Sequence, residues 1–148
     1  MKRPVPAPTT ALFAALLLCA GCGHKPAQPP RAPISGTESG TVQAFTATDF
    51  TAALADPRPV LVDFWAPWCG PCRKQGPIVE DVAKQMGDRA LVGKVNVDDE
   101  KDLATRYEIR AIPTLVILKG GRVVQRFEGV RSAEDLVQAL IQTSEAAK

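Results

Sequence analysis

The sequence predicts an α/β domain in which helices cover a central, mixed β-sheet. From residue 41 to residue 148, short apolar segments of β-type composition alternate with segments whose apolar residues recur at helical spacing. This alternation is typical of a sheet flanked by helices on both faces. The last two strand segments flank Gly120-Gly121, which is a hairpin signal. Because a hairpin joins antiparallel strands, we expect a mixed sheet and not a fully parallel one.

The first three elements are two strands with a helix between them. Val42–Phe45 is a short strand candidate, and a helix is expected at Thr48–Ala55 because its first two residues, Thr and Asp, are typical of a helix start. Val60–Trp65 is a nearly continuous apolar run, which is the pattern of a strand covered on both faces. Asp63 is the one interruption of that run.

A long amphipathic helix is expected next. Pro71 stands where a helix can begin, and Gly87 stands where this one should end. Pro77 lies inside the pattern and predicts a kink. The apolar stripe consists of Ile78, Val79, Val82, Ala83 and Met86.

The remaining elements end in a helix with one apolar face. In order they are a strand at Ala90–Val97, a short helix at Lys101–Tyr107, strands at Thr114–Leu118 and Arg122–Phe127, and a helix capped by Ser132. The apolar face of the last helix carries Leu136, Val137, Leu140 and Ile141.

Composition and charge describe one ordinary domain. The chain of 148 residues is 23% charged and 45% apolar, with a formal net charge of +2. This charge gives no electrostatic footprint for nucleic acid, so no nucleic-acid partner is expected. The stretch 41–148 is long enough for a single domain.

The first 21 residues have the pattern of a secretory signal. Lys2 and Arg3 precede the apolar run Ala11–Ala20, which is too short to span a membrane permanently. The following Leu18-Cys19-Ala20-Gly21-Cys22 resembles the lipobox of bacterial lipoproteins, which implies cleavage before Cys22 and lipidation of that cysteine. Cys19 occupies a position where that family usually has leucine, so cleavage without lipid stays open as an alternative.

Residues 22–40 are expected to form a lipid anchor and a proline-rich tether. The stretch has few bulky apolar residues and cannot bury enough surface to offset its ordering entropy. The lipoprotein resemblance implies a domain anchored in the cell envelope and facing the periplasm. Gly23, in place of aspartate, favours the outer membrane. A soluble periplasmic or secreted protein is the alternative.

The chemistry of the domain is expected at Cys69-Gly70-Pro71-Cys72. Cys69 lies at the expected helix N-terminus, where free N–H groups and the helix dipole favour a thiolate, so its pKa should fall below ~8.5. Cys72 is about one turn further on, within reach for a disulfide. We therefore expect Cys69 to attack a substrate disulfide and Cys72 to resolve the mixed disulfide, with Pro71 stiffening the ring.

Three other interpretations of this pair are weaker. An inert disulfide across two residues would constrain the unfolded chain little. Two buried free thiols do not suit a strand-to-helix corner. A metal site needs more ligands, and residues 41–148 contain no other Cys and no His. Pairing Cys69 and Cys72 with Cys19 and Cys22 in a zinc site would need far longer spacing than a zinc ribbon has. We expect neither metal nor cofactor.

The segment Val62–Cys72 (VDFWAPWCGPC) closely resembles the active-site segment of thioredoxins. The resemblance extends over 41–148 and includes Pro77, Lys94, Ile112-Pro113-Thr114 and Gly129. It implies the thioredoxin fold and protein-disulfide oxidoreductase activity.

The same resemblance implies a substrate groove beside Cys69. Pro113 matches the family's cis-proline, which faces the cysteine pair; a trans proline opening an edge strand is the alternative. The implied groove residues are Trp68, Ile112, Pro113, Gly129 and Val130. For Trp68 and Ile112, simple core packing is the alternative.

Asp63 and Lys94 are expected to support the cysteines. A carboxyl group in an apolar strand should have a raised pKa, which suits proton exchange with Cys72. Lys94 matches the lysine that neighbours this acid in the family. A buried structural ion pair is the alternative.

Gly70-Pro71 resembles the reducing members of the family, so the sequence predicts a reductase of protein disulfides. Export to an oxidising compartment would then require a membrane electron donor. An oxidase, an isomerase and a non-enzymatic binding module with the same fold remain open. No sign of a dimerisation element is present, and we expect a monomer.

Overall fold

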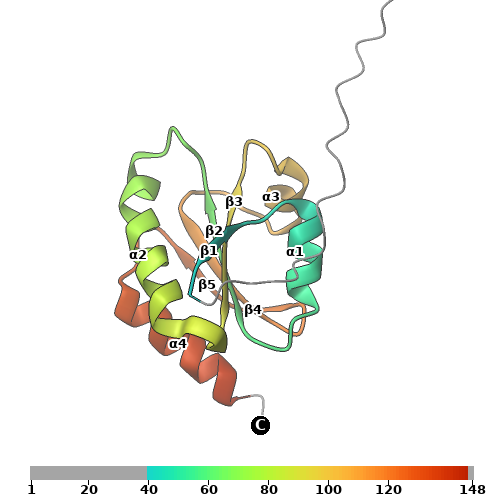
Figure 1. Ribbon diagram of the computed structural model, residues 1–148. Coiled ribbons are helices and arrows are strands. Elements are labelled where there is room, and N and C mark those ends of the chain that lie inside the picture. The colour runs from blue at the N-terminus through green and yellow to red at the C-terminus, as the bar shows by residue number, and fades with distance from the viewer. Residues whose placement is uncertain (1–39, 147–148) are drawn as a thin grey trace, which may run out of the picture. The chain divides into compact units, whose positions relative to one another are not determined.

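The computed structural model describes residues 40–146, which form a five-stranded sheet with helices on both faces (Figure 1). The strands are β1 (Val42–Ala44), β2 (Val60–Trp65), β3 (Leu91–Asn96), β4 (Thr114–Lys119) and β5 (Arg122–Glu128). The helices are α1 (Ala47–Leu54), α2 (Gly70–Met86), α3 (Lys101–Arg106) and α4 (Ala133–Glu145), with a short 3-10 helix, η1 (Gly87–Arg89).

The sheet is mixed, as predicted. Its strand order is β1-β3-β2-β4-β5. β1, β3 and β2 run parallel, whereas β4 is antiparallel to both β2 and β5. β2 therefore lies at the centre and is buried on both faces, which explains its nearly continuous apolar sequence.

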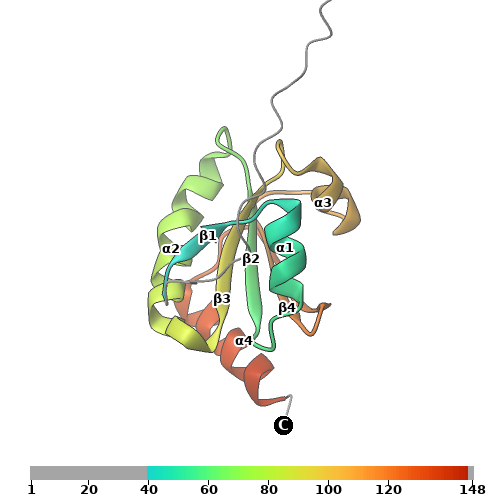
Figure 2. The ribbon, with the colours of Figure 1, turned by 45° about the vertical axis from the view of Figure 1, so that its right-hand side comes forward.

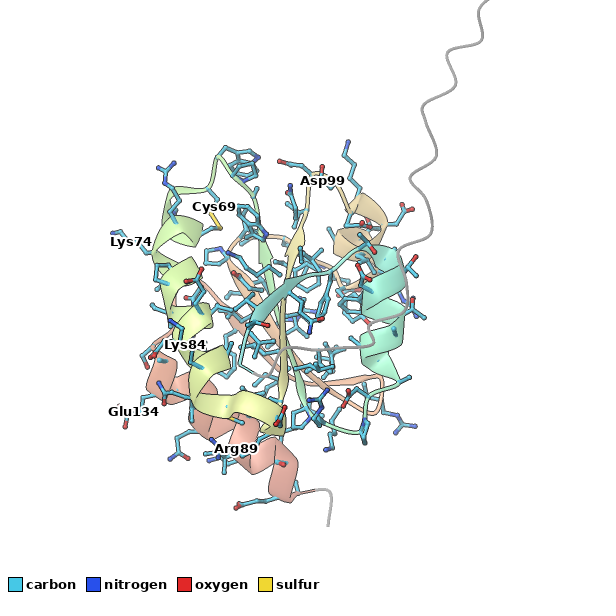
Figure 3. The ribbon with its side chains drawn as sticks, in the orientation of Figure 1. Cys69, Lys74, Lys84, Arg89, Asp99 and Glu134 are labelled. Carbon is cyan, nitrogen blue, oxygen red and sulfur yellow. A yellow bond between two sulfur atoms is a disulfide. The ribbon has the colours of Figure 1, made fainter. Side chains whose placement is uncertain are left out.

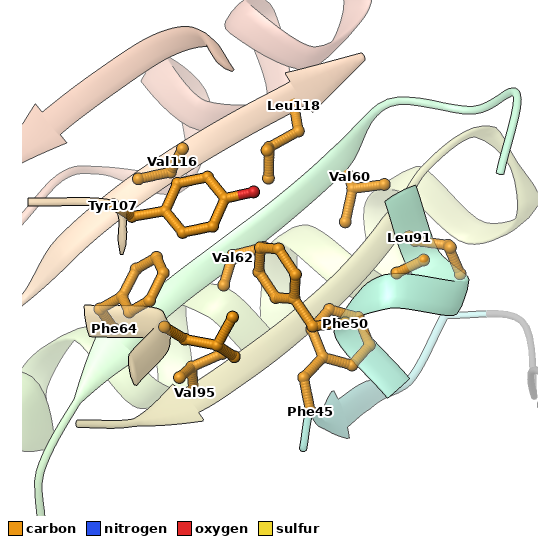
Figure 4. Packing of buried hydrophobic residues seen from close by; sticks show 12 residues of the cluster. Phe45, Phe50, Val60, Val62, Phe64, Leu91, Val95, Tyr107, Val116 and Leu118 are labelled. Carbon is orange, nitrogen blue, oxygen red and sulfur yellow. The ribbon is translucent and has the colours of Figure 1, made fainter. Parts of the chain in front are cut away.

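One face of the sheet packs against α1 and α3. Phe50 of α1 and Tyr107, just after α3, meet at a centroid distance of 5.1 Å. Val62 and Phe64 of β2 project into the same cluster (Figure 4). On this face Gly93 of β3 leaves the space that the ring of Phe45 fills.

The opposite face packs against α2 and α4, which lie together on one side of the sheet (Figure 2). Leu61 of β2 belongs to this second cluster. Because side chains alternate along a strand, Asp63 points to the same face, beneath α2. Lys94 is the register partner of Asp63 in β3 and shares that face.

The helix starts differ from the prediction at one place. α1 begins at Ala47 with Thr46 as its N-cap, not at Thr48. The Thr46 hydroxyl accepts from the Asp49 amide, and the Asp49 carboxylate accepts from the Thr46 amide, which makes a capping box. Asp49 is therefore part of the helix start, but as the N3 partner of Thr46. Thr48, which we expected to begin the helix, lies inside its first turn.

The long helix α2 runs through Pro77 and ends at Met86, with Gly87 as its C-cap. Four residues of the predicted stripe are buried, and Ile78 is half-buried. The buried face also includes Gln75 and Gly76, which the apolar pattern did not indicate. The predicted last helix is present, with Leu136 and Leu140 buried and Val137 and Ile141 half-buried.

Gly40, the first described residue, lies against the far end of α2. A Cβ added to Gly40 would be 3.5 Å from the Ala83 carbonyl oxygen and 3.5 Å from the Lys84 Cα. The predicted signal, the lipidated Cys22 and almost all of the tether lie outside the described residues. Within 40–146, no helix is long and apolar enough to cross a membrane.

Candidate functional site

The two cysteines of the domain form a disulfide at the junction of β2 and α2. The Cys69–Cys72 S–S distance is 2.04 Å, and the two Cα atoms are 5.3 Å apart. Cys69 lies at the N-terminal end of α2, at the same end of the sheet as Asp99 (Figure 3).

The helix distinguishes the two sulfurs. Cys69 is the N-cap of α2, and the Cys72 backbone N–H donates to the Cys69 Sγ at 3.1 Å. The same amide and the positive end of the helix would stabilise a thiolate on Cys69 after reduction. Exposure does not separate the pair, because Cys69 is 4% and Cys72 is 3% exposed. The N-cap position of Cys69 is therefore what sets it apart from Cys72 in the oxidised protein.

The loop that precedes β4 lies next to Cys69. The Ile112–Pro113 peptide bond is cis, as the resemblance implied. The carbonyl oxygen of Ile112 lies 3.7 Å from the Cys69 Sγ, and the half-buried Ile112 side chain packs against the cysteine cluster. Gly129 joins this loop from the end of β5, since its N–H donates to the Pro113 carbonyl at 2.8 Å.

Trp68 lies on the surface beside the disulfide. Its side chain is 67% exposed, so core packing is excluded for this residue. Its Nε1–H donates to the Asp98 Oδ2 at 2.8 Å. Our sequence reading did not include Asp98. Its position just beyond β3 was a usable signal, because parallel neighbours such as β2 and β3 end at the same edge of a sheet.

An open pocket lies beside the first turn of α2. It is lined by Gly70, Pro71, Arg73, Lys74 and Val130. Val130 is one of four large apolar residues of the described domain that are exposed, at 42%. Of the residues predicted for the groove, Ile112 lies next to Cys69, Gly129 is hydrogen-bonded to Pro113, Val130 lines the pocket, and Trp68 is exposed on the surface.

Asp63 is fully buried beneath α2 and has no hydrogen-bond partner for either carboxylate oxygen in the described part of the chain. Burial raises the pKa of the Asp63 carboxyl to about 6, while the positive charge of Lys94 acts in the opposite direction and more weakly. The predicted raised pKa thus has desolvation as its main cause.

Lys94 contacts an aromatic ring and not the acid. Its Nζ lies 4.7 Å from the centroid of the Trp65 ring. Within residues 40–146 no ion pair joins Lys94 to Asp63, so the alternative of a structural ion pair is not realised. The same residues hold no cluster of three or more His, Cys, Asp or Glu arranged for a metal ion.

A matching family model, two related sequences and a solved structure that resembles this chain are all thioredoxins. The family model described as Thioredoxin matches residues 41–142. A thioredoxin of Alicyclobacillus acidocaldarius is 43% identical over 91 residues, which are 62% of this chain and 87% of the relative. Thioredoxin 1 of Nostoc sp. is 44% identical over 102 residues, 69% of this chain and 95% of the relative. Among solved structures, a mutant thioredoxin from Halobacterium salinarum superposes with a TM-score of 0.68 at 33% identity, over 74% of this chain and 96% of that one.

Proposed function

The chain belongs to the thioredoxin family and is a protein-disulfide oxidoreductase, and we propose that it works as a reductase outside the cytoplasm. The observation that carries the chemistry is the Cys72 N–H donating to the Cys69 Sγ at the N-cap of α2. This arrangement prepares one sulfur of the pair, and only one, to exist as a nucleophilic thiolate.

In the proposed cycle, the Cys69 thiolate attacks one sulfur of a substrate disulfide. The substrate S–S bond breaks, a mixed disulfide forms, and the first substrate sulfur leaves as a thiolate that takes a proton from solvent. Cys72 then loses its proton, for which Asp63 is the proposed acceptor, and attacks the Cys69 sulfur. The second substrate sulfur leaves, and the Cys69–Cys72 disulfide forms. Two electrons have passed to the substrate, and an external dithiol donor must return them.

Support for the reducing direction comes from the two residues between the cysteines. Gly70 and Pro71 carry no charge, and no histidine occurs in the stretch 40–146. A cation between the cysteines would stabilise the thiolate, favour the reduced protein and make it an oxidant. The neutral pair leaves the dithiol as the stronger reductant.

The enzymatic activity can be tested with insulin as a disulfide substrate and dithiothreitol as donor, and the direction by the redox state of the protein in cells. We expect wild type to accelerate reduction and Cys69→Ser to abolish the acceleration. Equal rates for the two proteins would instead favour a binding module. In cells, thiol alkylation should find much of the protein as dithiol; a pool that is almost wholly disulfide in an otherwise normal strain would favour an oxidase or isomerase.

The order of attack can be tested by trapping. In Cys72→Ser the mixed disulfide cannot be resolved, so substrates should stay bound to Cys69 until a reductant is added. Cys69→Ser is the matched control and should capture far less. More adducts on Cys72 than on Cys69 would reverse the assigned order.

The proposed location rests on the leader. The lipobox-like segment ending at Cys22 supports lipidation there, anchorage in the cell envelope facing the periplasm, and electrons supplied by a membrane partner. Metabolic labelling with a fatty acid should mark wild type but not Cys22→Ala, and the variant should leave the membrane fraction. Absence of label from a wild-type protein that is nevertheless exported would favour a soluble periplasmic or secreted form.

A further inference from the structure

Gln75 is a fully buried polar residue in α2, three residues beyond Cys72. Its side chain is 0% exposed and lies on the packed face of the helix. Its Oε1 accepts the backbone N–H of Arg131 at 2.8 Å, whereas its Nε2 has no hydrogen-bond partner among the residues described. An unpartnered buried nitrogen lowers stability, and an apolar side chain of the same size would avoid that loss. Packing alone therefore does not favour glutamine at this position.

The acceptor bond of Gln75 holds one end of the segment 129–131. The other end is held by the Gly129 N–H, which donates to the Pro113 carbonyl at 2.8 Å. The Arg131 guanidinium adds a third contact, 5.6 Å from the ring centroid of Phe127 in β5. Of these three contacts, the one made by Gln75 leads to the helix that carries the cysteines.

Val130 lies between the two hydrogen-bonded residues. It is exposed and lines the open pocket together with Gly70 and Pro71, the residues between the sulfurs. The position of Val130 relative to Cys69 is thus fixed from two sides, by the Pro113 loop and by Gln75.

We infer that Gln75 is a positioning residue, which holds the 129–131 segment at the distance from Cys69 that an extended polypeptide substrate requires. The inference rests on the proposed function, because it assigns the Val130 side of the groove to substrate. Gln75 does not touch the reacting sulfurs in this role. A small disulfide, which does not contact Val130, should not depend on Gln75.

The test compares wild type with Gln75→Leu and Gln75→Met, which keep the size of the side chain and remove its acceptor. Gln85→Leu is the matched control, since Gln85 is an exposed glutamine of the same helix that donates to Asp81. We would measure kcat and KM with insulin, the rate with the small disulfide 5,5′-dithiobis(2-nitrobenzoate), urea unfolding, and hydrogen exchange of the Arg131 amide.

Loss of one such hydrogen bond should raise KM for insulin about fivefold. We expect kcat and the small-disulfide rate to change less than twofold. The unfolding midpoint should change little, because losing the acceptor of the Arg131 N–H and removing the unpartnered Nε2 act in opposite directions. The Arg131 amide should exchange faster, while Gly129 keeps its protection. A purely structural role would lower the unfolding midpoint without separating the two substrates.

Two results would overturn the inference. One is faster Arg131 exchange with an unchanged KM for insulin. The other is an equal fall in the rates with insulin and with the small disulfide. Failure of the proposed activity is recognised separately, because wild type and Cys69→Ser would then reduce insulin at equal rates. If the cellular pool proves almost wholly disulfide, the same comparison would be made on oxidation of a reduced peptide by the Cys69–Cys72 disulfide.

Discussion

Replacing Asp63 with asparagine should stabilise the folded protein above pH 6 and leave its stability near pH 4 almost unchanged. Asparagine has the shape of the protonated acid but cannot ionise. The wild-type carboxyl is completely buried, without a hydrogen-bond partner in the described residues, and burial raises its pKa from 3.8 to about 6. The substitution therefore isolates the cost of holding a charge beneath α2.

The sign of this change in stability with pH follows from proton linkage. Because the folded pKa is above the unfolded one, the unfolded state loses its proton first as pH rises. The stability contribution of protonated Asp63 is fully present below pH 3.8 and is lost as pH rises through about 6. A pKa raised from 3.8 to about 6 corresponds to a contribution to the free energy of unfolding on the order of 3 kcal/mol.

Urea unfolding of the oxidised protein from pH 4 to pH 8, followed by tryptophan fluorescence, measures this difference. The free energy of unfolding of Asp63→Asn minus that of wild type should be near zero at pH 4 and rise to on the order of 3 kcal/mol at pH 8. Asp81→Asn, at an exposed carboxylate of α2, provides the baseline for removing a charge from the same helix. A difference that does not change with pH would refute the reasoning, and a falling difference would show that Lys94 stabilises the ionised acid.

Three further substitutions test the packing and the backbone. Gly93→Ala should destabilise the fold by about 3 kcal/mol or more, because its Cβ would overlap the ring of Phe45; in urea unfolding, a Phe45→Leu background should recover part of the loss, and strict additivity would contradict the overlap. Thr46→Ala should cost about 1 kcal/mol of unfolding free energy by removing the capping box with Asp49, and an unchanged urea midpoint would show that the cap is not needed. Gly129→Ala should cost about 1–2 kcal/mol through its φ of +78°, since nothing lies within 4 Å of the added Cβ. A loss well above that for Gly129→Ala in thermal unfolding would indicate a steric clash.

The sheet and its helices were predictable because their signals are local. Val60–Trp65 reads as a buried strand from six consecutive residues, and Gly120-Gly121 specifies the hairpin that makes the sheet mixed. The start of α1 was misplaced because both Thr46 and Thr48 are acceptable caps, and only the backbone shows which hydroxyl reaches the Asp49 amide.

The cysteine pair and Asp63 were also predictable from nearby residues. The two cysteines are spaced by about one helical turn, and Asp63 is a carboxylic acid in an otherwise apolar strand. Gln75 and Asp98 were missed because each depends on a partner far along the chain. Gln75 is polar at a position where the apolar stripe gives no reason to expect burial, and its acceptor bond reaches 56 residues away. In the sequence Asp98 is an ordinary acidic residue of a loop. Its role becomes visible only in the fold, where it accepts a hydrogen bond from Trp68, which is 30 residues away along the chain.

The backbone of Gly40 lies close to Ala83 and Lys84, near the C-terminal end of α2. Cys69 and Ala83 are separated by most of α2, a distance of about 20 Å at the helical rise per residue. The polypeptide thus joins the domain at the pole opposite the sulfurs. The described chain therefore begins on a side of the domain away from the sulfurs, and the surface around Gly40 is separate from the surface around the Cys69–Cys72 disulfide.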